Sequence, residues 1–359
     1  MRPIHYLGVF IPVAIALELA HADAVLVFGA AALAVIPCAA VMGEATEAIA
    51  ARTGPGVGGL LNVTFGNAPE LIIAFFALLE GLQEVVKASI VGSVIGNILL
   101  VMGGAMLVGG LPRDKQTFSR TAANAQSAML MLALAALIFP ALFQLIHGGG
   151  LPQVGEERVN FGSDLEKLSF GVAVVLLISY VAGLFFSLRT HRAVFNPYSE
   201  QEDETHRWPV RRAAVYLALA AVAVGVMSEI LVGSITEASE DVGLSEFFVG
   251  VFVVAIVGNA AEHWVAVLVA AKDKMDLAVN IAIGSSAQIA LFVAPVLVLL
   301  SFVFGPEPMA LVFNGYELGA LLFAVLIANL VTQEGESNWF EGVQLLALYA
   351  VLGLVFYFA

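Results

Sequence analysis

Long apolar segments follow one another along almost the whole chain, and short polar stretches separate them. Each segment is long enough to cross the roughly 30 Å of hydrocarbon in a bilayer as a helix. Hydropathy of this kind predicts an all-α, polytopic membrane protein. About 11 transmembrane helices are expected, at residues 4–20, 23–50, 57–80, 84–110, 119–146, 166–188, 210–235, 244–271, 275–304, 309–331 and 338–358.

Composition supports a membrane protein. Of the 359 residues, 60% are hydrophobic and only 12% are charged, and the mean hydropathy is +0.95. Soluble domains carry about a quarter charged residues, so a soluble globular protein is excluded. The single cysteine, Cys38, lies in an apolar run, where we expect it to pack in the core. One cysteine supports neither a disulfide framework nor a Cys-rich metal site.

The positively charged residues indicate the orientation of the chain. Lys and Arg accumulate on the cytoplasmic side of membrane proteins. With a cytoplasmic N-terminus, only Lys87, Arg158 and Lys167 of the 15 Lys and Arg residues fall on the other side. An odd number of spans then places the C-terminus outside.

A short motif occurs twice inside the apolar segments. Gly-Asn-Ala-Pro-Glu at 66–70 returns as Gly-Asn-Ala-Ala-Glu at 258–262, 192 residues later. In each copy a Gly-Ser pair ends 23 residues after the glutamate, at Ser93 and at Ser285. An acid within a membrane segment is costly and marks a functional site by default. We therefore interpret Glu70 and Glu262 as the core of an ion site built from two internal repeats.

The repeat spacing also predicts the topology. The two motif copies lie in the third and eighth expected spans, so the repeat period is five helices. Because five is odd, the second copy enters the membrane from the opposite face, as in many secondary transporters. The expected organisation is an N-terminal peripheral helix at 1–22, a first five-helix repeat at 23–188, an acidic cytoplasmic linker at 189–209 and a second repeat at 210–359.

Oxygen donors surround the two glutamates in the sequence. Asn67 and Asn259 precede them by three residues and share their helical face. Glycine and proline in the motifs weaken the helix and can free the carbonyls of Gly66 and Gly258. Carboxylate, amide and hydroxyl oxygens without thiolates suit a hard cation such as Ca²⁺. The predicted ligands are Glu70, Glu262, Asn67, Asn259, Ser93, Ser285, Gln288, Gly66 and Gly258.

The same acids suggest the counter-ion. Burial and mutual repulsion disfavour the charged form of a carboxylate, so an empty site should take up protons and a Ca²⁺-filled site should release them. Mutually exclusive occupancy of this kind is an antiport mechanism. Glu70 and Glu262 are thus also the predicted proton-binding residues. His263 either relays protons or tunes Glu262, or is a packed histidine bonded to a backbone carbonyl.

Other polar residues invite weaker hypotheses. Glu44 and Glu229 lie near the ends of the spans before the two motif helices, where they either line the ion pathway or are interfacial. Asn97, beside the first-repeat counterpart of Gln288, is assigned to the pathway with them. The acidic part of the linker is either a solvated charge run or a regulatory cation surface, formed by Glu200, Glu202, Asp203 and Glu204.

These motifs resemble the two signature repeats of the calcium/proton exchangers, the cation-exchanger branch of the calcium/cation antiporter superfamily. Further similarity lies in Ile283–Ile289, in Val293-Ala294-Pro295 and in Gly335-Glu336-Ser337-Asn338. The resemblance implies a ten-helix core of two inverted repeats preceded by one extra helix, and Ca²⁺ export driven by protons. It implies that Glu70 and Glu262 bind both ions.

Alternatives remain open from sequence. A sodium-coupled or other monovalent cation/Ca²⁺ exchanger is one, although Asn-Ala in both motifs departs from the Gly-Thr-Ser type signature of sodium/calcium exchangers. A cation channel is another alternative. For an intramembrane enzyme, the sequence shows no nucleophile with its base, so we predict no enzyme.

We expect no cofactor and no nucleic-acid partner. The expected partners are the lipid bilayer, Ca²⁺ and protons, and no oligomeric state is favoured. The expected location is a prokaryotic cytoplasmic membrane.

Overall fold

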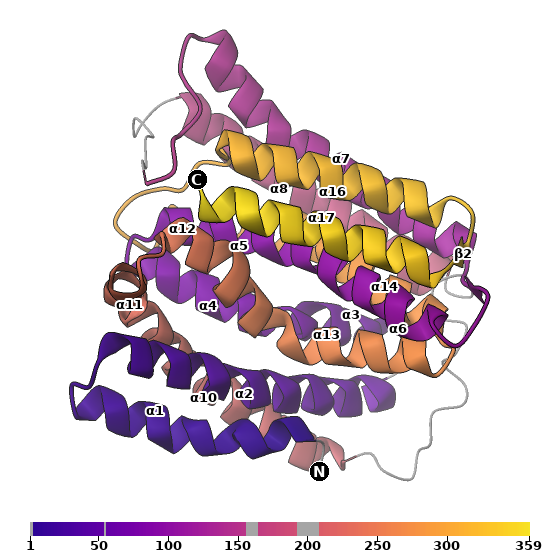
Figure 1. Ribbon diagram of the computed structural model, residues 1–359, viewed down its shortest axis with the longest axis horizontal. Coiled ribbons are helices and arrows are strands. Elements are labelled where there is room, and N and C mark those ends of the chain that lie inside the picture. The colour runs from indigo at the N-terminus through magenta and orange to yellow at the C-terminus, as the bar shows by residue number, and fades with distance from the viewer. Residues whose placement is uncertain (1–2, 54, 156–163, 192–207) are drawn as a thin grey trace. The chain divides into compact units, whose positions relative to one another are not determined.

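The computed structural model describes residues 3–53, 55–155, 164–191 and 208–359 (Figure 1). Among these residues, nine helices are long and apolar enough to cross a membrane. Two shorter apolar helices cover Ile4–Leu19 and Ala68–Leu79. The all-α polytopic architecture is confirmed, while the count of eleven spans stays a prediction.

The helices follow the apolar pattern closely. In the first half of the chain they are η1 (Pro3–Val9), α1 (Phe10–Leu19), α2 (Ala24–Thr53), α3 (Pro55–Gly66), α4 (Ala68–Leu79), α5 (Gln83–Ile95), η2 (Gly96–Val101), α6 (Met102–Gly110), α7 (Arg120–Ile146), α8 (Asp164–Phe185) and η3 (Phe186–Thr190). In the second half they are α10 (Val210–Gly233), α11 (Ile235–Val242), α12 (Glu246–Phe248), η5 (Val249–Val254), α13 (Ala255–Ala271), α14 (Met275–Gln288), η6 (Ile289–Val293), α15 (Ala294–Ser301), α16 (Gly315–Thr332) and α17 (Trp339–Tyr357).

One expected span is interrupted. The segment 57–80 forms two helices, because α3 ends at Gly66 and α4 begins at Ala68, with Asn67 between them. Pro69 lies in the first turn of α4, where its missing N–H costs nothing. The first motif therefore breaks its helix, as its glycine and proline predict.

The start of one further span differs from the sequence-based boundary. Residues 309–314 precede α16 instead of belonging to it. Asn314 accepts a hydrogen bond from the backbone N–H of Glu317, and Glu317 accepts one from the N–H of Asn314. This reciprocal capping box fixes the helix start. Hydropathy alone extends the span because Met309–Phe313 is apolar.

By contact, the chain divides into two compact units, each described here by itself. The first consists of Met1–Phe76, Val181–Gly243 and Val257–Ala261. Its centre is the 30-residue helix α2, which packs against α1, α3, α10 and α11. Cys38 and Met42 of α2 form an apolar core with Ala220 and Val224 of α10. Cys38 is buried, which confirms its predicted place in the core.

The second unit consists of Ala77–Tyr180, Leu244–Ile256 and Glu262–Ala359. Its centre is formed by two long helical rods, α5–η2–α6 and α14–η6–α15. Helix α14 contacts α6 and the strand β1 (Gln116–Thr117) that follows it, and α5 contacts η6. Asp276, in the first turn of α14, accepts the N–H of Ser119, which follows α6 in the chain, so the two rods run in opposite directions. They meet where the Ser286 hydroxyl donates to the backbone carbonyl of Val94 at 3.3 Å.

This contact joins equivalent positions of the two repeats, because Ser286 and Val94 are 192 residues apart. A contact between a residue and its own repeat counterpart lies on a pseudo-two-fold axis. For this pair of helices, the contact agrees with the predicted inversion of the repeats, which stays a prediction. The compact units cut across the expected repeat boundaries, because packing groups helices from both repeats in each unit.

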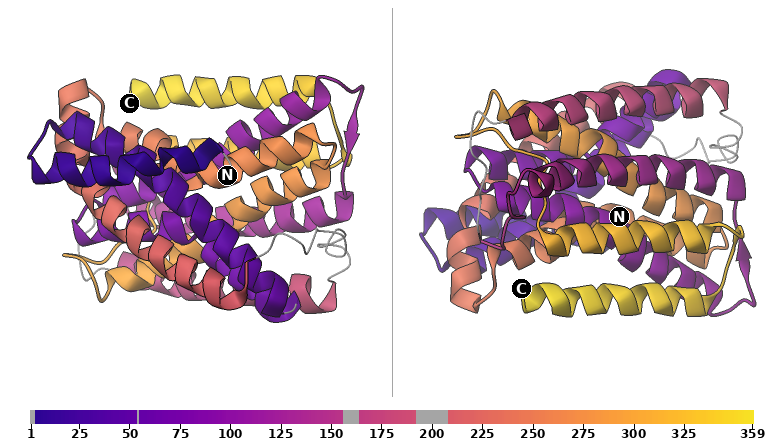
Figure 2. Two further views of the ribbon diagram at one scale, coloured as in Figure 1. Left: turned by 90° about the horizontal axis from the view of Figure 1, so that it is seen from below. Right: turned by 90° about the horizontal axis from the view of Figure 1, so that it is seen from above.

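Outer helices of the second unit cover these rods. Helices α16 and α17 contact each other and lie side by side (Figures 1 and 2). At one end the short strands β1 (Gln116–Thr117) and β2 (Glu336–Ser337) pair antiparallel. A salt bridge of 2.8 Å between Lys115 and Glu336 joins the same two loops. These links tie the loop before α7 to the loop before α17.

Candidate functional site

The first glutamate lies where its helix breaks. Glu70 occupies the first turn of α4, and it is 8% exposed, while Asn67 is fully buried at 0%. The carbonyl of Asn67 accepts the N–H of Leu71, which starts the new helix. A helix N-terminus stabilises a carboxylate through its partial positive charge. The break therefore places an acid where a buried negative charge is tolerated.

The second motif contributes to the surroundings of Glu70 within the first unit. A Cβ atom added to Gly258 would lie 3.2 Å from Cγ of Glu70 and 3.7 Å from Cδ1 of Ile73. Glycine at this position therefore allows α13 to approach α4 closely at the acid. Asn259, the next residue, is completely buried. Glu70 thus packs against the backbone of the repeated motif.

The second glutamate is hydrogen-bonded within the second unit. The Ser285 hydroxyl donates to Oε2 of Glu262 at 2.6 Å. Ser285 is buried and Glu262 is partly buried. A hydrogen bond from a neutral hydroxyl to a carboxylate is short and strong. The structure therefore brings together two of the predicted ligands of the second repeat.

His263 has a side-chain partner. Its Nε2 lies 3.2 Å from Oδ1 of Asn97, which is completely buried in η2. Since an amide oxygen only accepts, this contact requires a proton on Nε2. The bond differs from the backbone-carbonyl contact considered from sequence, and it connects the second motif helix to a residue of the first repeat.

The first Gly-Ser pair lies in a tight helix crossing. A Cβ atom on Gly92 would lie 1.9 Å from the carbonyl oxygen of Val251, so only glycine fits there. Ser93 is buried. After each Gly-Ser pair the helix widens into a π-helical segment, η2 from Gly96 and η6 from Ile289. Such segments are rare and occur frequently at functional sites, and apolar periodicity gives no signal for them.

The predicted ligands are divided between the units. The first unit holds Gly66, Asn67, Glu70, Gly258 and Asn259, and the second holds Ser93, Glu262, Ser285 and Gln288. In the second motif the expected weakening is absent, because α13 runs without interruption from Ala255 to Ala271. The π-helical segment η5 lies just before it, at Val249–Val254. The two copies therefore depart from ideal helix at different points.

The remaining predicted residues have varied surroundings. Glu44 lies 3.6 Å from Nε2 of His5 in the N-terminal segment. Glu229 is exposed near the end of α10. The acidic linker residues Glu200, Glu202, Asp203 and Glu204 lie outside the described residues. Within the described part of the chain, no group of three or more His, Cys, Asp or Glu is placed to hold a metal ion; the predicted ligand set differs in kind, with two carboxylates and neutral oxygens.

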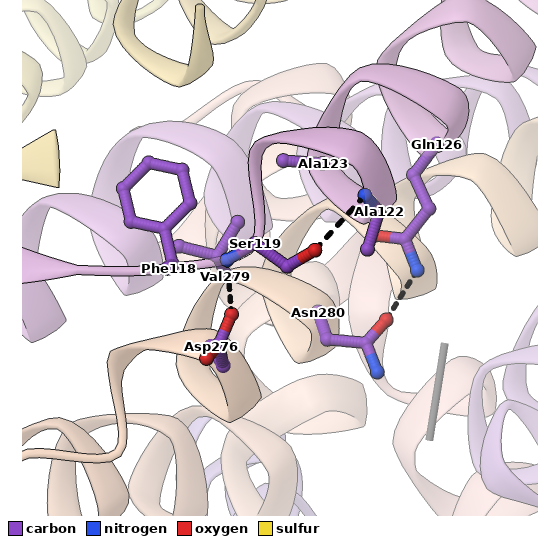
Figure 3. A pocket seen from close by; sticks show the side chains of 8 residues that line it. All are labelled: Phe118, Ser119, Ala122, Ala123, Gln126, Asp276, Val279 and Asn280. Atoms are coloured by element: carbon purple, nitrogen blue, oxygen red, sulfur yellow. Dashed lines mark hydrogen bonds between the residues drawn. The ribbon is translucent and has the colours of Figure 1, made fainter. Parts of the chain in front are cut away.

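Two small polar cavities were not predicted from sequence. The first lies between the N-terminal ends of α7 and α14 (Figure 3). In it Gln126 donates to Asn280, and Asp276 accepts the backbone N–H of Ser119. Glu84, Lys87, Asn314 and Glu317 line the second cavity with Pro152 and Gln153. The sequence does contain an indication of the two cavities. Asp276 of the first cavity follows Glu84 of the second by 192 residues, so the two acids occupy equivalent positions of the repeats.

Comparison with known proteins assigns the chain to a protein family. The model of the family described as "Sodium/calcium exchanger protein" matches residues 24–189 and 212–358. A Ca²⁺/H⁺ antiporter of Aphanothece halophytica is 45% identical, with 97% of this chain and 94% of that protein covered. The Ca²⁺/H⁺ antiporter ChaA of Bacillus subtilis is 42% identical, with 97% and 96% covered. A crystal structure of the Ca²⁺/H⁺ antiporter protein YfkE has a TM-score of 0.83 at 39% identity and covers both chains completely.

Proposed function

Since the chain belongs to the sodium/calcium exchanger protein family, we propose that it is an antiporter that exports Ca²⁺ from the cytosol in exchange for H⁺. The observation that carries the proposal is the similarity to named Ca²⁺/H⁺ antiporters over nearly their whole length. It agrees with the residue chemistry of the two motifs, in which carboxylate and neutral oxygens provide sites for a hard cation. These relatives are transporters, as the prediction of no enzymatic activity requires.

The motif sequence favours protons over sodium as the counter-ion. Both copies carry Asn-Ala between the glycine and the residue before the glutamate. A single pair of carboxylates can hold one divalent cation or protons, and the two occupancies exclude each other. Proton binding needs no further ligand, whereas a sodium ion would require a coordination shell.

We assign the ion site to Glu70 and Glu262. The hydrogen bond from Ser285 to Glu262 and the packing of Gly258 against Glu70 support the assignment, because each involves a motif residue of the predicted set. Asn67, Asn259, Ser93 and Gln288 complete the ligands by their position in the repeats. Antiparallel repeats around a shared site are the usual basis of alternating access, which is the mechanism we propose.

The relatives also support a proposal for the location. The family relatives include bacterial antiporters, and the chain is a multi-pass membrane protein. We propose the prokaryotic cytoplasmic membrane as its location. The charge asymmetry of the loops supports a cytoplasmic N-terminus and an external C-terminus.

Transport in reconstituted vesicles tests the function. Vesicles that contain the purified full chain, with an acidic interior and no sodium, should accumulate Ca²⁺ and lose their pH gradient at the same time. The matching experiment replaces the pH gradient with a sodium gradient. Uptake driven by sodium alone would establish a sodium-coupled exchanger instead, and passive flux without coupling would establish a channel.

Variants test the site. Glu70→Gln and Glu262→Gln should each lower exchange about 100-fold or more, because removing one member of a buried charged site costs about 2–5 kcal/mol. Glu240→Gln, the same chemical change at an exposed position of α11, is the control and should retain exchange. Full transport by either site variant would refute the assignment.

A further inference from the structure

Charged side chains away from the two motifs meet in the second cavity. Lys87 of α5 is 6% exposed and Glu317 of α16 is 2% exposed. Glu84, three residues before Lys87, lines the same cavity. All three belong to the second unit. Buried charges of this kind are rare unless they are paired or functional.

One carboxylate oxygen of Glu317, which lines the cavity, is left without a hydrogen bond among the described residues. Oε2 of Glu317 accepts the backbone N–H of Asn314 at 2.7 Å. Oε1 is buried and makes no hydrogen bond to any described residue. The Lys87 ammonium has three N–H donors, and its one hydrogen bond within the described part of the chain is a long one, 3.5 Å to the Val312 carbonyl. The cavity between them has room for about one water molecule.

Negative charge exceeds positive charge around the cavity. Two carboxylates, Glu84 and Glu317, share one ammonium, that of Lys87. Glu84 also accepts the backbone N–H of Gly155 at 2.8 Å, so its charge has a separate partner. Glu246 of α12 adds a further negative charge that acts on Glu84, and the loop side of the cavity, Pro152 and Gln153, carries no charge. The excess of negative charge in a poorly solvated place favours the uptake of one proton.

The repeats indicate where this cluster lies in the membrane. Glu84 precedes Ser93 by nine residues, which along an α-helix is about 14 Å, close to half the hydrocarbon thickness of about 30 Å. Asp276 precedes Ser285 by the same nine residues. Each cavity lies at the start of its helix, and α5 and α14 run in opposite directions. With the serines near the midplane, the two cavities therefore lie at opposite membrane surfaces, each at one mouth of the transporter.

The two cavities differ in chemistry at equivalent positions. Lys87 corresponds to Val279 by the 192-residue offset. Ser119 and Asn314 are 195 residues apart and are the N-cap residues of α7 and α16, so they match by their place at a helix start; three residues after them lie Ala122 and Glu317. The first cavity instead contains the neutral pair of Gln126 and Asn280. Among the described residues, the first cavity has the single carboxylate of Asp276, which accepts the Ser119 N–H, whereas the second cavity combines two carboxylates with an ammonium.

We propose that Glu317, with Lys87 and Glu84, is a proton-binding site at one mouth of the transporter, separate from the pair of motif glutamates. A proton from the adjoining water adds to Oε1 of Glu317, which neutralises the excess charge of the cluster, and it returns to water when it leaves. The cavity at the start of α14 has no counterpart of Lys87, because Val279 takes its place. Its role in exchange rests on the proposed Ca²⁺/H⁺ antiport.

Infrared spectroscopy of the purified full chain tests proton binding directly. The starting protein carries Glu70→Gln and Glu262→Gln, so that the proposed transport carboxyls no longer contribute. Its protonated-carboxyl band should grow as the pH falls, and Glu317→Gln should remove one carboxyl from that band. Glutamine keeps the capping box, so this variant should fold. Gln126→Leu, in the other cavity, is the matched control and should leave the band unchanged.

A second variant separates loss of the proton site from misfolding, because it should shift the carboxyl band without removing it. Lys87→Met removes the ammonium and should let Glu317 hold its proton to a pH at least one unit higher. A titrating band that Glu317→Gln leaves intact, or that Lys87→Met does not move, would overturn the proposal. In vesicles with wild-type motif glutamates, Glu317→Gln should shift the pH dependence of Ca²⁺ uptake and leave Ca²⁺ binding unchanged. If the wild-type chain transports no Ca²⁺ but the infrared result holds, the proton site stands and the proposed antiport falls.

Discussion

The hydroxyl of Ser285 donates a hydrogen bond of 2.6 Å to the Glu262 carboxylate, and the same 23-residue spacing separates Ser93 from Glu70. This bond orients a carboxylate that we assign to ion binding. It also makes the charged form more stable, because hydroxyl donors stabilise carboxylates. The second repeat therefore holds its glutamate in a defined position.

Ser285→Ala should weaken Ca²⁺ binding. A hydrogen bond to a charged group contributes about 1.5–3 kcal/mol, so we expect the Ca²⁺ concentration for half-maximal uptake to rise about tenfold or more. Initial rates of uptake over a range of Ca²⁺ concentrations measure it. The neighbouring Ser286→Ala is the control: it removes bonds to Val94 and Ala282 and should lower thermal stability without that shift. Equal Ca²⁺ dependence in both variants would contradict the role of Ser285.

Gly258→Ala should impair exchange more than its small size suggests. The added methyl group would lie 3.2 Å from Cγ of Glu70, so the acid must shift by a few tenths of an ångström. We expect at least a severalfold loss of Ca²⁺ uptake with little loss of folded protein. Gly319→Ala in α16, where no atom lies within 4 Å, should be neutral or slightly stabilising. Normal uptake by Gly258→Ala would show that Glu70 needs no such close backbone.

Asn97 and His263 should act as a coupled pair. Asn97→Leu removes the acceptor of the imidazole N–H and should destabilise the protein by about 1–3 kcal/mol. Adding His263→Leu to that variant should lower the free energy of unfolding by less than His263→Leu lowers it in the wild-type chain, since the partner is already lost. Thermal unfolding of the four proteins in detergent gives the coupling free energy, expected at about 0.5–3 kcal/mol. Strict additivity would mean that the 3.2 Å contact contributes nothing.

Gly92→Ala should prevent the native helix crossing. Its Cβ would lie 1.9 Å from the carbonyl oxygen of Val251, and backbone cannot move aside as a flexible side chain can. We expect most of the protein to be lost from detergent extracts, as seen by size-exclusion chromatography. Gly96→Ala, one turn later, meets no atom within 4 Å and should be recovered normally. Recovery of both variants in equal amounts would contradict the close packing of α5 and η5.

Much of the architecture could be predicted from single residues and their spacing. Apolar run length predicts the helices, because the bilayer fixes how long a spanning helix must be. Glycine and proline beside Asn67 predict the helix break before Glu70, since they act locally through the backbone. The 192-residue offset predicts which positions of the two repeats are equivalent, and Ser286 contacts its equivalent, Val94. These features depend on local chemistry or on symmetry, and both are present in the sequence.

Other features depend on which helices pack together. The sequence treats Lys87 as one more charge at a membrane edge, but the structure buries it in a cavity with Glu317, 230 residues away. Gly258 reads as a helix breaker, yet α13 continues through it, because its lack of a side chain serves close packing against Glu70. Asn97 gains its partner His263 only through the fold.

By itself the sequence determined the membrane class, the position of most helices and the repeated motif, because the solvent and the covalent backbone act on each segment separately. Only the tertiary structure decided which glycine accommodates which neighbour, which hydroxyl holds Glu262, and which buried charges share a cavity. Those relationships arise from contacts between segments far apart in the chain. Periodicity along one helix carries no information about the side chain that will face it.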